Sequence, residues 1–474
     1  MKRIAIIGGG IAGLTAAFYL EKARRAGADL QWTLFEKSSR LGGVLETEQR
    51  DGFVLEAGAD SFLTAKPDAT RLCQELGIGS EIIPSNDAGR KTYILVKGKL
   101  VPIPQGLEFM VPTRVWPMAT TPLFSFSTKL RMAAELFSAP PKHEKDESVG
   151  DFVRRHFGPE MVDRVAEPLL SGVYGGNVEA LSVRAVLPRF AEMEREHGSL
   201  VRATLRAKAQ NPNAQNKDKT KAAKPQPLFS SMKNGMQQII DALAAALPQS
   251  SIRLQQQDIS VRQINDDWQV ESSGLQERFQ AVLLAVPAPS GAAMLRQFHP
   301  ALIESLAKIQ YTSSAAVTLA YDHVVDLPPG HGFLVPRSER RKIMACTFVH
   351  RKFNHRAPQG KSLLRCFFSS SRIPDLLTYS DEALQQIARQ ELESILGVKA
   401  EPIFAQTFRW DRAMAQYETG HLDRVAEMEK IIATMPGFHI IGNSFHGIGV
   451  PDCIKSARLA AEQITSSVSQ PAPV

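Results

Sequence analysis

The sequence is poor in cysteine, and its cysteines form none of the pairs seen in metal or disulfide sites. The four cysteines, Cys73, Cys346, Cys366 and Cys453, are widely spaced and include no C-x-x-C pair. This spacing argues against a disulfide framework and a zinc module, and it fits a reducing cytosol. The sequence also lacks the H-E-x-x-H and G-x-S-x-G motifs, so metal catalysis and serine-based acyl transfer have no candidate residues, and we expect no metal.

Long hydrophobic runs are absent too. No apolar run reaches the roughly 18 to 20 residues that a membrane-spanning helix needs. Lys2 and Arg3 precede an apolar stretch, as in a signal peptide, but three glycines at 8–10 interrupt it, and a helix that ends in charges follows. We therefore predict a cytoplasmic protein without a signal peptide.

Acidic residues are scarce in one segment. The 474 residues include 56 Lys plus Arg and 49 Asp plus Glu, which gives a formal net charge of +7. Residues 201–227 hold seven of the basic residues and one acid, so the rest of the chain carries a net charge of only +1. Because the charge is confined to one segment and no motif reads bases, we expect no nucleic acid partner. Residues 207–227 have almost no apolar side chains, which predicts a basic flexible loop.

A strand, a glycine turn, a helix and a second strand follow one another at the N-terminus. The apolar strand 3–7 leads into G-x-G-x-x-G at 8–13, whose glycines allow a tight turn, a close approach to a pyrophosphate and close helix packing. The second strand, 30–35, ends at an acid placed to accept hydrogen bonds from a ribose. This pattern predicts adenine-dinucleotide binding. The candidate contacts are Gly8, Gly10, Ile11, Ala12, Gly13 and Glu36.

Similar apolar strands occur far along the chain, at 281–286 and 438–442, and a terminal helix is predicted from about 451 to 464. The economical interpretation is one discontinuous α/β domain with two insertions. Within the insertions, apolar periodicity predicts helices at 130–137, 149–170 and 381–396. It predicts strands at 315–321, 343–348 and 363–368.

Residues 36–43 read E-K-S-S-R-L-G-G and residues 53–61 read F-V-L-E-A-G-A-D-S. This pattern resembles the flavin amine oxidase superfamily, in which both stretches line FAD. The C-terminal stretches 441–444 and 447–454 resemble the last FAD-binding stretch of that superfamily, where a glycine-rich loop and a helix N-terminus face the flavin and the helix dipole favours the anionic reduced ring. The resemblance implies FAD as the cofactor. It adds as cofactor contacts Lys37, Arg40, Gly42, Gly43, Val44, Gly58, Ala59, Asp60, Ser61, Ile259, Trp410, Ile448, Gly449 and Val450.

Within that superfamily three further stretches are similar to the porphyrinogen oxidases: E-P-L-L-S-G-V-Y-G-G-N at 167–177, G-F-L-V-P at 332–336, and a C-terminal block at 409–421 and 449–454. The resemblance implies an enzyme of haem biosynthesis that oxidises protoporphyrinogen IX or coproporphyrinogen III to the porphyrin. Six electrons would leave in three hydride transfers to flavin N5, with dioxygen as acceptor. Residues 345–348 and 361–366 resemble the bacterial soluble branch, several of whose members are thought to prefer coproporphyrinogen III. An amine oxidase, a carotenoid-type desaturase and an FAD-binding interaction protein remain the alternatives.

The resemblance also implies substrate contacts. It assigns no catalytic side chain, because the flavin carries the chemistry. The cavity should be apolar, with a few basic groups outside it for the substrate carboxylates. The candidate substrate residues are Gly172, Tyr174, His331, Leu334, Val335, Arg90, Lys91, Arg365 and Cys366, of which Arg90, Lys91, His331 and Arg365 are the candidate carboxylate partners.

The Pro-rich apolar stretch 101–126, which contains Trp116, Phe109 and Leu123, has two interpretations. In membrane-bound members of the family a comparable region lies on the lipid surface. The alternative, which we favour, is the wall and mouth of the substrate cavity. Peripheral membrane contact, a partner that receives the product, and a monomeric or homodimeric state all stay open.

Taken together, these patterns predict an α/β protein of mixed α+β character. We expect a discontinuous Rossmann-like FAD-binding domain with an inserted substrate-binding domain and a helical subdomain able to associate with a membrane. The predicted boundaries are 1–84, 228–299 and 406–474 for the FAD-binding domain, 85–206 for the helical insertion, 207–227 for the basic loop and 300–405 for the strand-rich substrate-binding domain.

Overall fold

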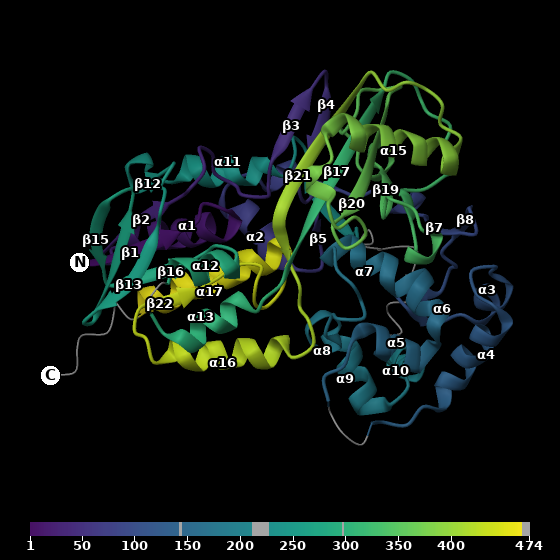
Figure 1. Cartoon of the computed structure of the whole chain (residues 1–474), viewed down its shortest axis with the longest axis horizontal. Helices are drawn as coiled ribbons and strands as arrows, with labels where there is room; N and C mark the ends of the chain where they lie inside the picture. The colour runs from purple at the N-terminus through teal and green to yellow at the C-terminus, as the bar shows by residue number, and fades with distance from the viewer. Residues whose placement is uncertain (142–144, 211–226, 296–297, 467–474) are drawn as a thin grey trace, which may run out of the picture. The chain divides into compact units, whose positions relative to one another are not determined.

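The computed structural model describes residues 1–141, 145–210, 227–295 and 298–466 (Figure 1). The chain divides into two compact units, and each has its own hydrophobic core. The first unit consists of Met1–Ser85, Leu228–Tyr311 and Leu422–Val474, and the second of Asn86–Pro227 and Thr312–His421.

A five-stranded parallel sheet lies at the centre of the first unit. Alternate residues of its strand β1 belong to different cores: Ile4 and Ile6 pack in one, whereas Ala5 and Ile7 pack in the other. Burial on both faces explains why the sequence of these strands is a continuous apolar run rather than an alternating one. The strand order is β12 (Ile252–Arg253), β2 (Leu30–Phe35), β1 (Lys2–Ile7), β16 (Ala281–Leu284) and β22 (Phe438–Ile440).

Helices and small sheets cover both faces of this sheet. The core that contains Ile4 and Ile6 includes residues of α1 (Ile11–Arg25), α2 (Pro67–Glu75), α11 (Gln237–Ala246) and α17 (Val450–Ser466). The core that contains Ala5 and Ile7 includes residues of β13 (Ser260–Ile264), β14 (Asp267–Ser272), β15 (Leu275–Phe279), α12 (Ala288–Met294), α13 (Pro300–Ala307) and α16 (His421–Ala433). The remaining strands of the unit are β3 (Thr47–Arg50), β4 (Phe53–Glu56), β5 (Phe62–Leu63), β6 (Ile82–Pro84) and β11 (Phe229–Met232). The predicted strands at 3–7, 30–35, 281–286 and 438–442 are therefore confirmed, the last two being shorter.

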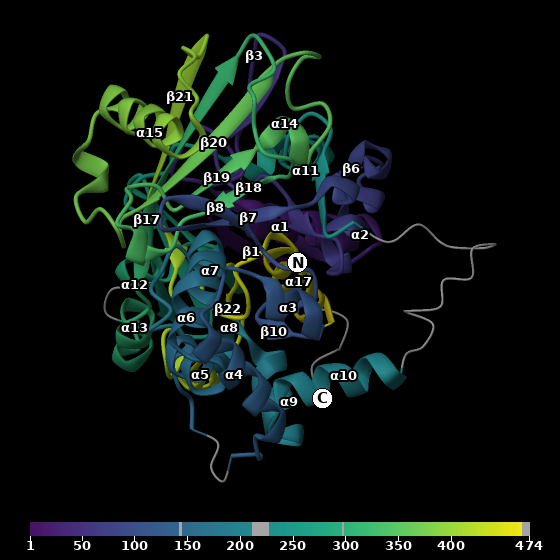
Figure 2. The same ribbon diagram turned by 90° about the vertical axis from the view of Figure 1, so that its right-hand side faces the viewer.

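A mixed seven-stranded sheet organises the second unit (Figure 2). Helix α15 (Asp381–Leu396) covers one face, because Leu384, Ala388 and Leu392 share a core with the sheet. Both predicted insertions contribute strands, since β7 of the first pairs with β18 of the second. The strand order is β21 (Phe404–Ala415), β17 (Tyr311–Tyr321), β20 (Ser362–Ser369), β19 (Ala345–Phe348), β18 (Gly332–Leu334), β7 (Thr92–Val96) and β8 (Lys99–Pro102).

Short helices form the rest of the second unit. The continuous helix predicted over 149–170 is divided, because Gly158 adopts φ +91° and Pro159 starts a new turn. Residues 207–210, predicted as loop, are instead the last turn of α10, where alanine and lysine favour a helix; residues 211–226 lie outside the described residues. The helices are α3 (Val115–Thr120), α4 (Phe126–Ala134), α5 (Val149–Phe157), α6 (Pro159–Met161), α7 (Glu167–Tyr174), α8 (Val183–Val186), α9 (Pro188–His197), α10 (Leu200–Gln210) and α14 (Val349–Lys352), with a 3₁₀ turn η3 (Glu135–Phe137), a π-helical turn η4 (Val162–Ala166) and a small hairpin of β9 (Leu107–Glu108) and β10 (Val111–Pro112).

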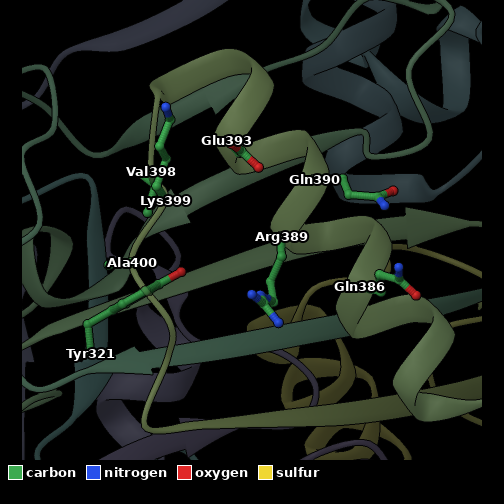
Figure 3. A pocket seen from close by; sticks show the side chains of 8 residues that line it. All are labelled: Tyr321, Gln386, Arg389, Gln390, Glu393, Val398, Lys399 and Ala400. Atoms are coloured by element: carbon green, nitrogen blue, oxygen red, sulfur yellow. The ribbon is translucent and has the colours of Figure 1, made fainter.

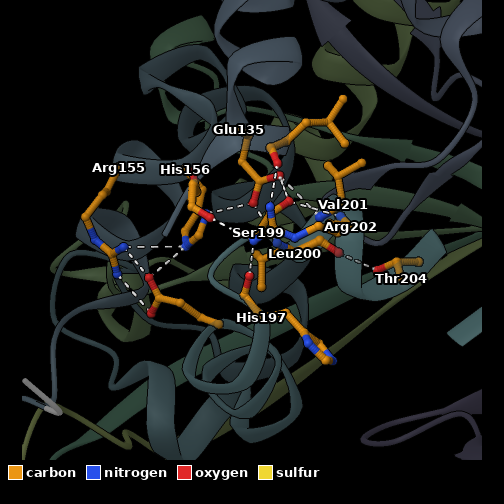
Figure 4. Close-up of polar contacts among 12 residues, drawn as sticks. Glu135, Arg155, His156, His197, Ser199, Leu200, Val201, Arg202 and Thr204 are labelled. Carbon is orange, nitrogen blue, oxygen red and sulfur yellow. Dashed lines mark hydrogen bonds and ion pairs between the residues drawn. The ribbon is translucent and has the colours of Figure 1, made fainter. Parts of the chain in front are cut away.

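A buried cluster of charges joins these helices (Figure 4). His156 of α5 lies between two carboxylates, with Nδ1 3.0 Å from Glu135 and Nε2 3.1 Å from Glu194. Glu135 also accepts hydrogen bonds from the Ser199 hydroxyl at 2.8 Å and the Leu200 N–H at 2.6 Å, and so caps α10. Burial lowers the pKa of His156, but its hydrogen bonds to Glu135 and Glu194 outweigh burial and raise the pKa above its usual value.

One helical surface exposes large apolar side chains. Val115 and Trp116 of α3 and Phe126 of α4 are 86%, 77% and 81% exposed. Leu123, between these two helices, is fully buried. No helix within the described part of the chain is long and apolar enough to cross a membrane.

Candidate functional site

The carboxyl ends of β1 and β2 meet at one edge of the five-stranded sheet. Ile7 pairs with Phe35, and the Gly8 N–H donates to the Phe35 carbonyl at 2.8 Å. Loops that leave this edge of a parallel sheet form the usual ligand crevice of doubly wound folds. The glycine turn after β1, Glu36 after β2 and the loop after β22 all leave from this edge.

The glycine turn has the shape that a diphosphate requires. Gly8 adopts φ +108°, and a Cβ atom added to Gly13 would lie 1.9 Å from the Gly8 carbonyl oxygen. A Cβ added to Gly10, in contrast, would meet no atom of the described residues within 4 Å, so this side of the turn is open to a close ligand. Gly10 is also the N-cap of α1 and supplies no side chain to cap the helix, which leaves first-turn N–H groups for an anion.

Glu36 is held against this turn. Its Oε2 accepts a hydrogen bond from the Gly9 N–H at 2.6 Å, and its Oε1 accepts one from the Ser38 N–H at 2.8 Å. A carboxylate has about four acceptor positions, so the group retains capacity for a ribose hydroxyl. The fold therefore places Glu36, the predicted ribose acceptor, next to the glycine turn.

The loop at 40–44 lies beside the same turn. The Gly42 N–H donates to the Gly9 carbonyl at 2.8 Å, and Arg40 donates to the Gly43 carbonyl at 2.5 Å. A Cβ added to Gly58 would lie 1.9 Å from the Val44 carbonyl oxygen, which places the start of the 58–61 segment against this loop. In that segment, Asp60 accepts a hydrogen bond from the Ser61 hydroxyl at 2.6 Å.

The other predicted cofactor contacts lie in several places. The stretch that holds Ile448, Gly449 and Val450 connects β22 to α17 and belongs to the first unit, as do Lys37 and the partly buried Ile259. Trp410 is on β21 of the second unit. The open turn, the carboxylate and the uncapped helix N-terminus of the first unit fit an adenine dinucleotide. Within the described residues, no group of three His, Cys, Asp or Glu side chains could hold a metal ion.

Strand alternation sorts the substrate candidates of the second unit. The core under α15 contains Val335 and Cys366, so their side chains point away from the opposite face of the sheet. Leu334 and Arg365 alternate with these residues and therefore share that opposite face. Arg365 is 4% exposed, and its guanidinium lies 4.8 Å from the centre of the Phe367 ring.

The remaining substrate candidates lie on α7 or in and near the segment before β7. Tyr174 of α7 is buried, with its ring centre 6.0 Å from that of Tyr417. Gly172, on the same helix, would offer open space to a Cβ. His331 Nε2 lies 3.0 Å from the Asn86 carbonyl, and burial lowers the pKa of this imidazole. Arg90 forms a 3.8 Å ion pair with an aspartate one turn earlier, and Lys91 is exposed.

One buried ion pair was not predicted from the sequence. Arg372 lies 3.2 Å from Glu167 of α7 and donates to the Val335 carbonyl at 2.5 Å, which joins α7 to the chain beyond β18. Burial raises the pKa of the Glu167 carboxyl despite this arginine. Glu167 opens the stretch 167–177, but nothing in the sequence pairs it with a residue 205 positions away.

A small polar cavity of about 200 Å³ lies at the end of β17 (Figure 3). Tyr321 and Arg389 line it, together with residues 398–400. Tyr321 belongs to the core on the α15 side of the sheet, so the cavity lies on the face opposite to Leu334 and Arg365. It contains none of the predicted substrate residues.

Comparisons with known proteins place the chain in a family. The model described as "Flavin containing amine oxidoreductase" matches residues 11–465, and a flavin is the cofactor that this description names. A coproporphyrinogen III oxidase of Bacillus subtilis is 34% identical over 464 residues, which is 97% of each chain. A coproporphyrinogen III oxidase of Propionibacterium freudenreichii is 33% identical, over 99% of this chain and 92% of the relative. The crystal structure of a candidate protoporphyrinogen oxidase from Exiguobacterium superposes with a TM-score of 0.85 at 32% identity, over 98% of this chain and 99% of the other. The resemblance to flavin amine oxidases is thereby confirmed, and the chain belongs to the flavin-containing amine oxidoreductase family.

Proposed function

We propose that this protein uses FAD to oxidise a porphyrinogen to the porphyrin in haem biosynthesis. Coproporphyrinogen III is the first substrate to test. The observation that carries the proposal is the similarity, over almost the whole chain, to relatives named coproporphyrinogen III oxidase. These relatives favour porphyrinogen oxidation over the alternatives of amine oxidation and carotenoid desaturation. Protoporphyrinogen IX is the second substrate to compare.

The first unit supports FAD as the particular flavin. The glycine turn between Gly8 and Gly13 would hold the diphosphate, and Glu36 would bind the ribose of the adenosine half. The 40–44 loop, the 58–61 segment and the loop before α17 would hold the rest of the cofactor. Bound FAD supplies two-electron oxidation, so a porphyrinogen, which loses six electrons and six protons, needs three turnovers, with dioxygen as the proposed acceptor.

The second unit supports binding of an apolar disc with carboxylates at its rim. Leu334 offers an apolar contact from the sheet, and Gly172 leaves room on α7. Among the four basic candidates, Arg365 is the one that we propose as the carboxylate partner. Its guanidinium is buried and shares a sheet face with Leu334. An arginine in such a place can bind a carboxylate through two parallel hydrogen bonds.

The exposed helical surface supports a weak membrane contact. Val115, Trp116 and Phe126 are 86%, 77% and 81% exposed, which is unusual for three large apolar side chains in one helical region. Lys129 and Arg131 add positive charge on α4, the helix that carries Phe126. This arrangement fits attachment to an anionic lipid surface better than it fits the wall of a cavity. The buried Leu123, in contrast, supports the packing of the helices rather than lipid contact.

The proposed function is tested with purified protein and both porphyrinogens in parallel. Chromatography of the released cofactor against FAD and FMN standards establishes whether FAD is bound, and porphyrin fluorescence measures the product. We expect bound FAD and product formation from at least one porphyrinogen in air. A protein that holds reducible FAD but forms porphyrin from neither substrate would contradict the proposal.

A further inference from the structure

Two charged residues that lie 386 positions apart in the sequence form an ion pair in the first unit, at the edge of the five-stranded sheet where the proposed cofactor site lies. The Lys66 ammonium lies 2.7 Å from Oδ1 and 2.6 Å from Oδ2 of Asp452. Lys66 is the residue before α2, and Asp452 is in the first turn of α17. The ammonium thus covers both oxygens of the carboxylate.

Asp452 is also in contact with the glycine-rich loop that precedes α17. Its Oδ2 accepts a hydrogen bond from the Gly449 N–H at 3.3 Å. A Cβ added to Gly447, which adopts φ +138°, would lie 2.6 Å from the Asp452 Cγ. The backbone of the loop therefore lies directly on the carboxylate, and a negative charge is fixed where the loop leaves the carboxyl edge of the sheet.

A second ion pair joins the same two helices with the opposite polarity. Arg458, six residues further along α17, lies 3.4 Å from Asp68 of α2. Residues of α2 and α17 also share the core that contains Leu72 and Ile454. The docking of these helices therefore does not depend on Lys66. The specific effect of this lysine is to neutralise the charge of Asp452.

From this geometry we infer that Lys66 is a positioning residue that sets the reduction potential of the bound flavin by neutralising Asp452. The inference rests on the proposed FAD site, in which the loop at 447–449 faces the flavin. Reduction adds negative charge to a flavin, and a helix N-terminus stabilises that charge. An unpaired carboxylate in the first turn of α17 would oppose this stabilisation, and the ammonium of Lys66 cancels the opposing charge.

The inference predicts shifts of opposite sign for the two single variants. Lys66→Met exposes the Asp452 charge, so the flavin becomes harder to reduce and its potential falls. Asp452→Asn leaves the ammonium without its partner, so the potential rises, while the asparagine oxygen can still accept from Gly449. A shift of roughly tenfold in the reduction equilibrium corresponds to about 30 mV for a two-electron couple. The double variant should return close to the wild-type potential.

The experiment is a reductive titration of the flavin-loaded full chain in the presence of a reference dye. Arg458→Met is the matched control, because it removes a charge from the same pair of helices further from the loop. We expect it to leave the potential unchanged. Shifts of opposite sign for the single variants, and their cancellation in the double variant, support the inference.

Equal potentials in all variants, or shifts of the same sign in both single variants, would overturn it. Loss of flavin from a variant is resolved by adding less than one molar equivalent of FAD to concentrated apoprotein, so that all of the flavin is bound, and by comparing the apoprotein unfolding temperatures. If the ion pair had only a structural role, both single variants would unfold at lower temperatures, but their flavin potentials would not shift in opposite directions. Wild-type protein that binds no flavin would contradict the proposed function instead, so the two failures are distinct.

Discussion

A side chain on Gly13 would collide with Gly8, because a Cβ atom there would lie 1.9 Å from the Gly8 carbonyl oxygen. Helix α1 therefore starts in direct backbone contact with the turn that precedes it. This contact aims the N-terminus of α1 at the open side of Gly10, where the proposed diphosphate is held.

The contact between Gly13 and Gly8 should matter for both stability and cofactor binding. Gly13→Ala should lower the free energy of unfolding by about 1–3 kcal/mol and weaken FAD binding, because the added methyl group separates α1 from the turn. Thermal unfolding and titration of the apoprotein with FAD measure the two effects. Gly89→Ala is the control, since a Cβ there meets no atom of the described residues within 4 Å. Equal FAD affinity in the two variants would contradict the proposal that this glycine turn holds the diphosphate.

Arg365 is the proposed partner of a substrate carboxylate. Arg365→Lys should raise KM for the porphyrinogen about tenfold or more, because the bidentate pair is lost while the positive charge remains. Arg90→Lys should have little effect, since Arg90 is a half-exposed side chain paired with Asp87.

Steady-state kinetics with the free acid and with its methyl ester separate the causes. The ester has no carboxylates, so wild type and Arg365→Lys should handle it equally. A KM for the free acid that Arg365→Lys leaves unchanged would eliminate this arginine as the partner.

The buried His156 should make the stability of the protein depend on pH. The pKa of His156 is raised in the folded protein, so the stability that its charged form contributes is fully present below the usual histidine pKa of about 6.5 and is lost as the pH rises through the folded pKa. Unfolding free energies should therefore fall in this window by about 1.4 kcal/mol per pH unit relative to His156→Asn. Denaturant unfolding from pH 6 to pH 9 measures this difference.

His446→Asn serves as the comparison, because His446 and Glu429 form an exposed pair with both side chains more than half accessible. Solvent screens such a pair, so this variant controls for the loss of an exposed histidine pair. Parallel profiles for wild type and His156→Asn would show that His156 is not charged in its buried cluster.

The exposed helical surface is the proposed site of membrane contact. A Trp116→Gln and Phe126→Ser double variant should bind vesicles that contain anionic lipid about tenfold more weakly than wild type, because it removes two large apolar contacts. Co-sedimentation with vesicles measures binding. Leu275→Ser on β15 of the first unit is the control, since Leu275 is also 66% exposed. Equal sedimentation of the wild type, the double variant and Leu275→Ser would contradict membrane contact through this surface.

Local sequence patterns predicted the part of the site that is built from neighbouring residues. Gly8, Gly13 and Glu36 lie within 30 positions, and their spacing alone indicates strand, turn, helix and strand. The apolar runs of the parallel sheet were equally recognisable, because burial on both faces leaves no polar alternation.

Pairings between distant segments could not be predicted in this way. Nothing in the sequence near Lys66 indicates Asp452, and nothing near Glu167 indicates Arg372, because each contact depends on how strands and helices pack. The direction of side chains was equally hidden. Cys366 was a substrate candidate from resemblance, yet the register of β20 turns it into the core under α15 and turns Arg365 to the other face.

The most direct test of the proposed function is anaerobic mixing of the flavin-loaded protein with coproporphyrinogen III, followed by controlled addition of air. We expect the flavin absorbance to bleach on mixing and to return with air. Three such cycles should occur for each porphyrin that becomes fluorescent, because the oxidation removes six electrons two at a time. A flavin that dithionite reduces, but that stays oxidised with coproporphyrinogen III and with protoporphyrinogen IX, would contradict it.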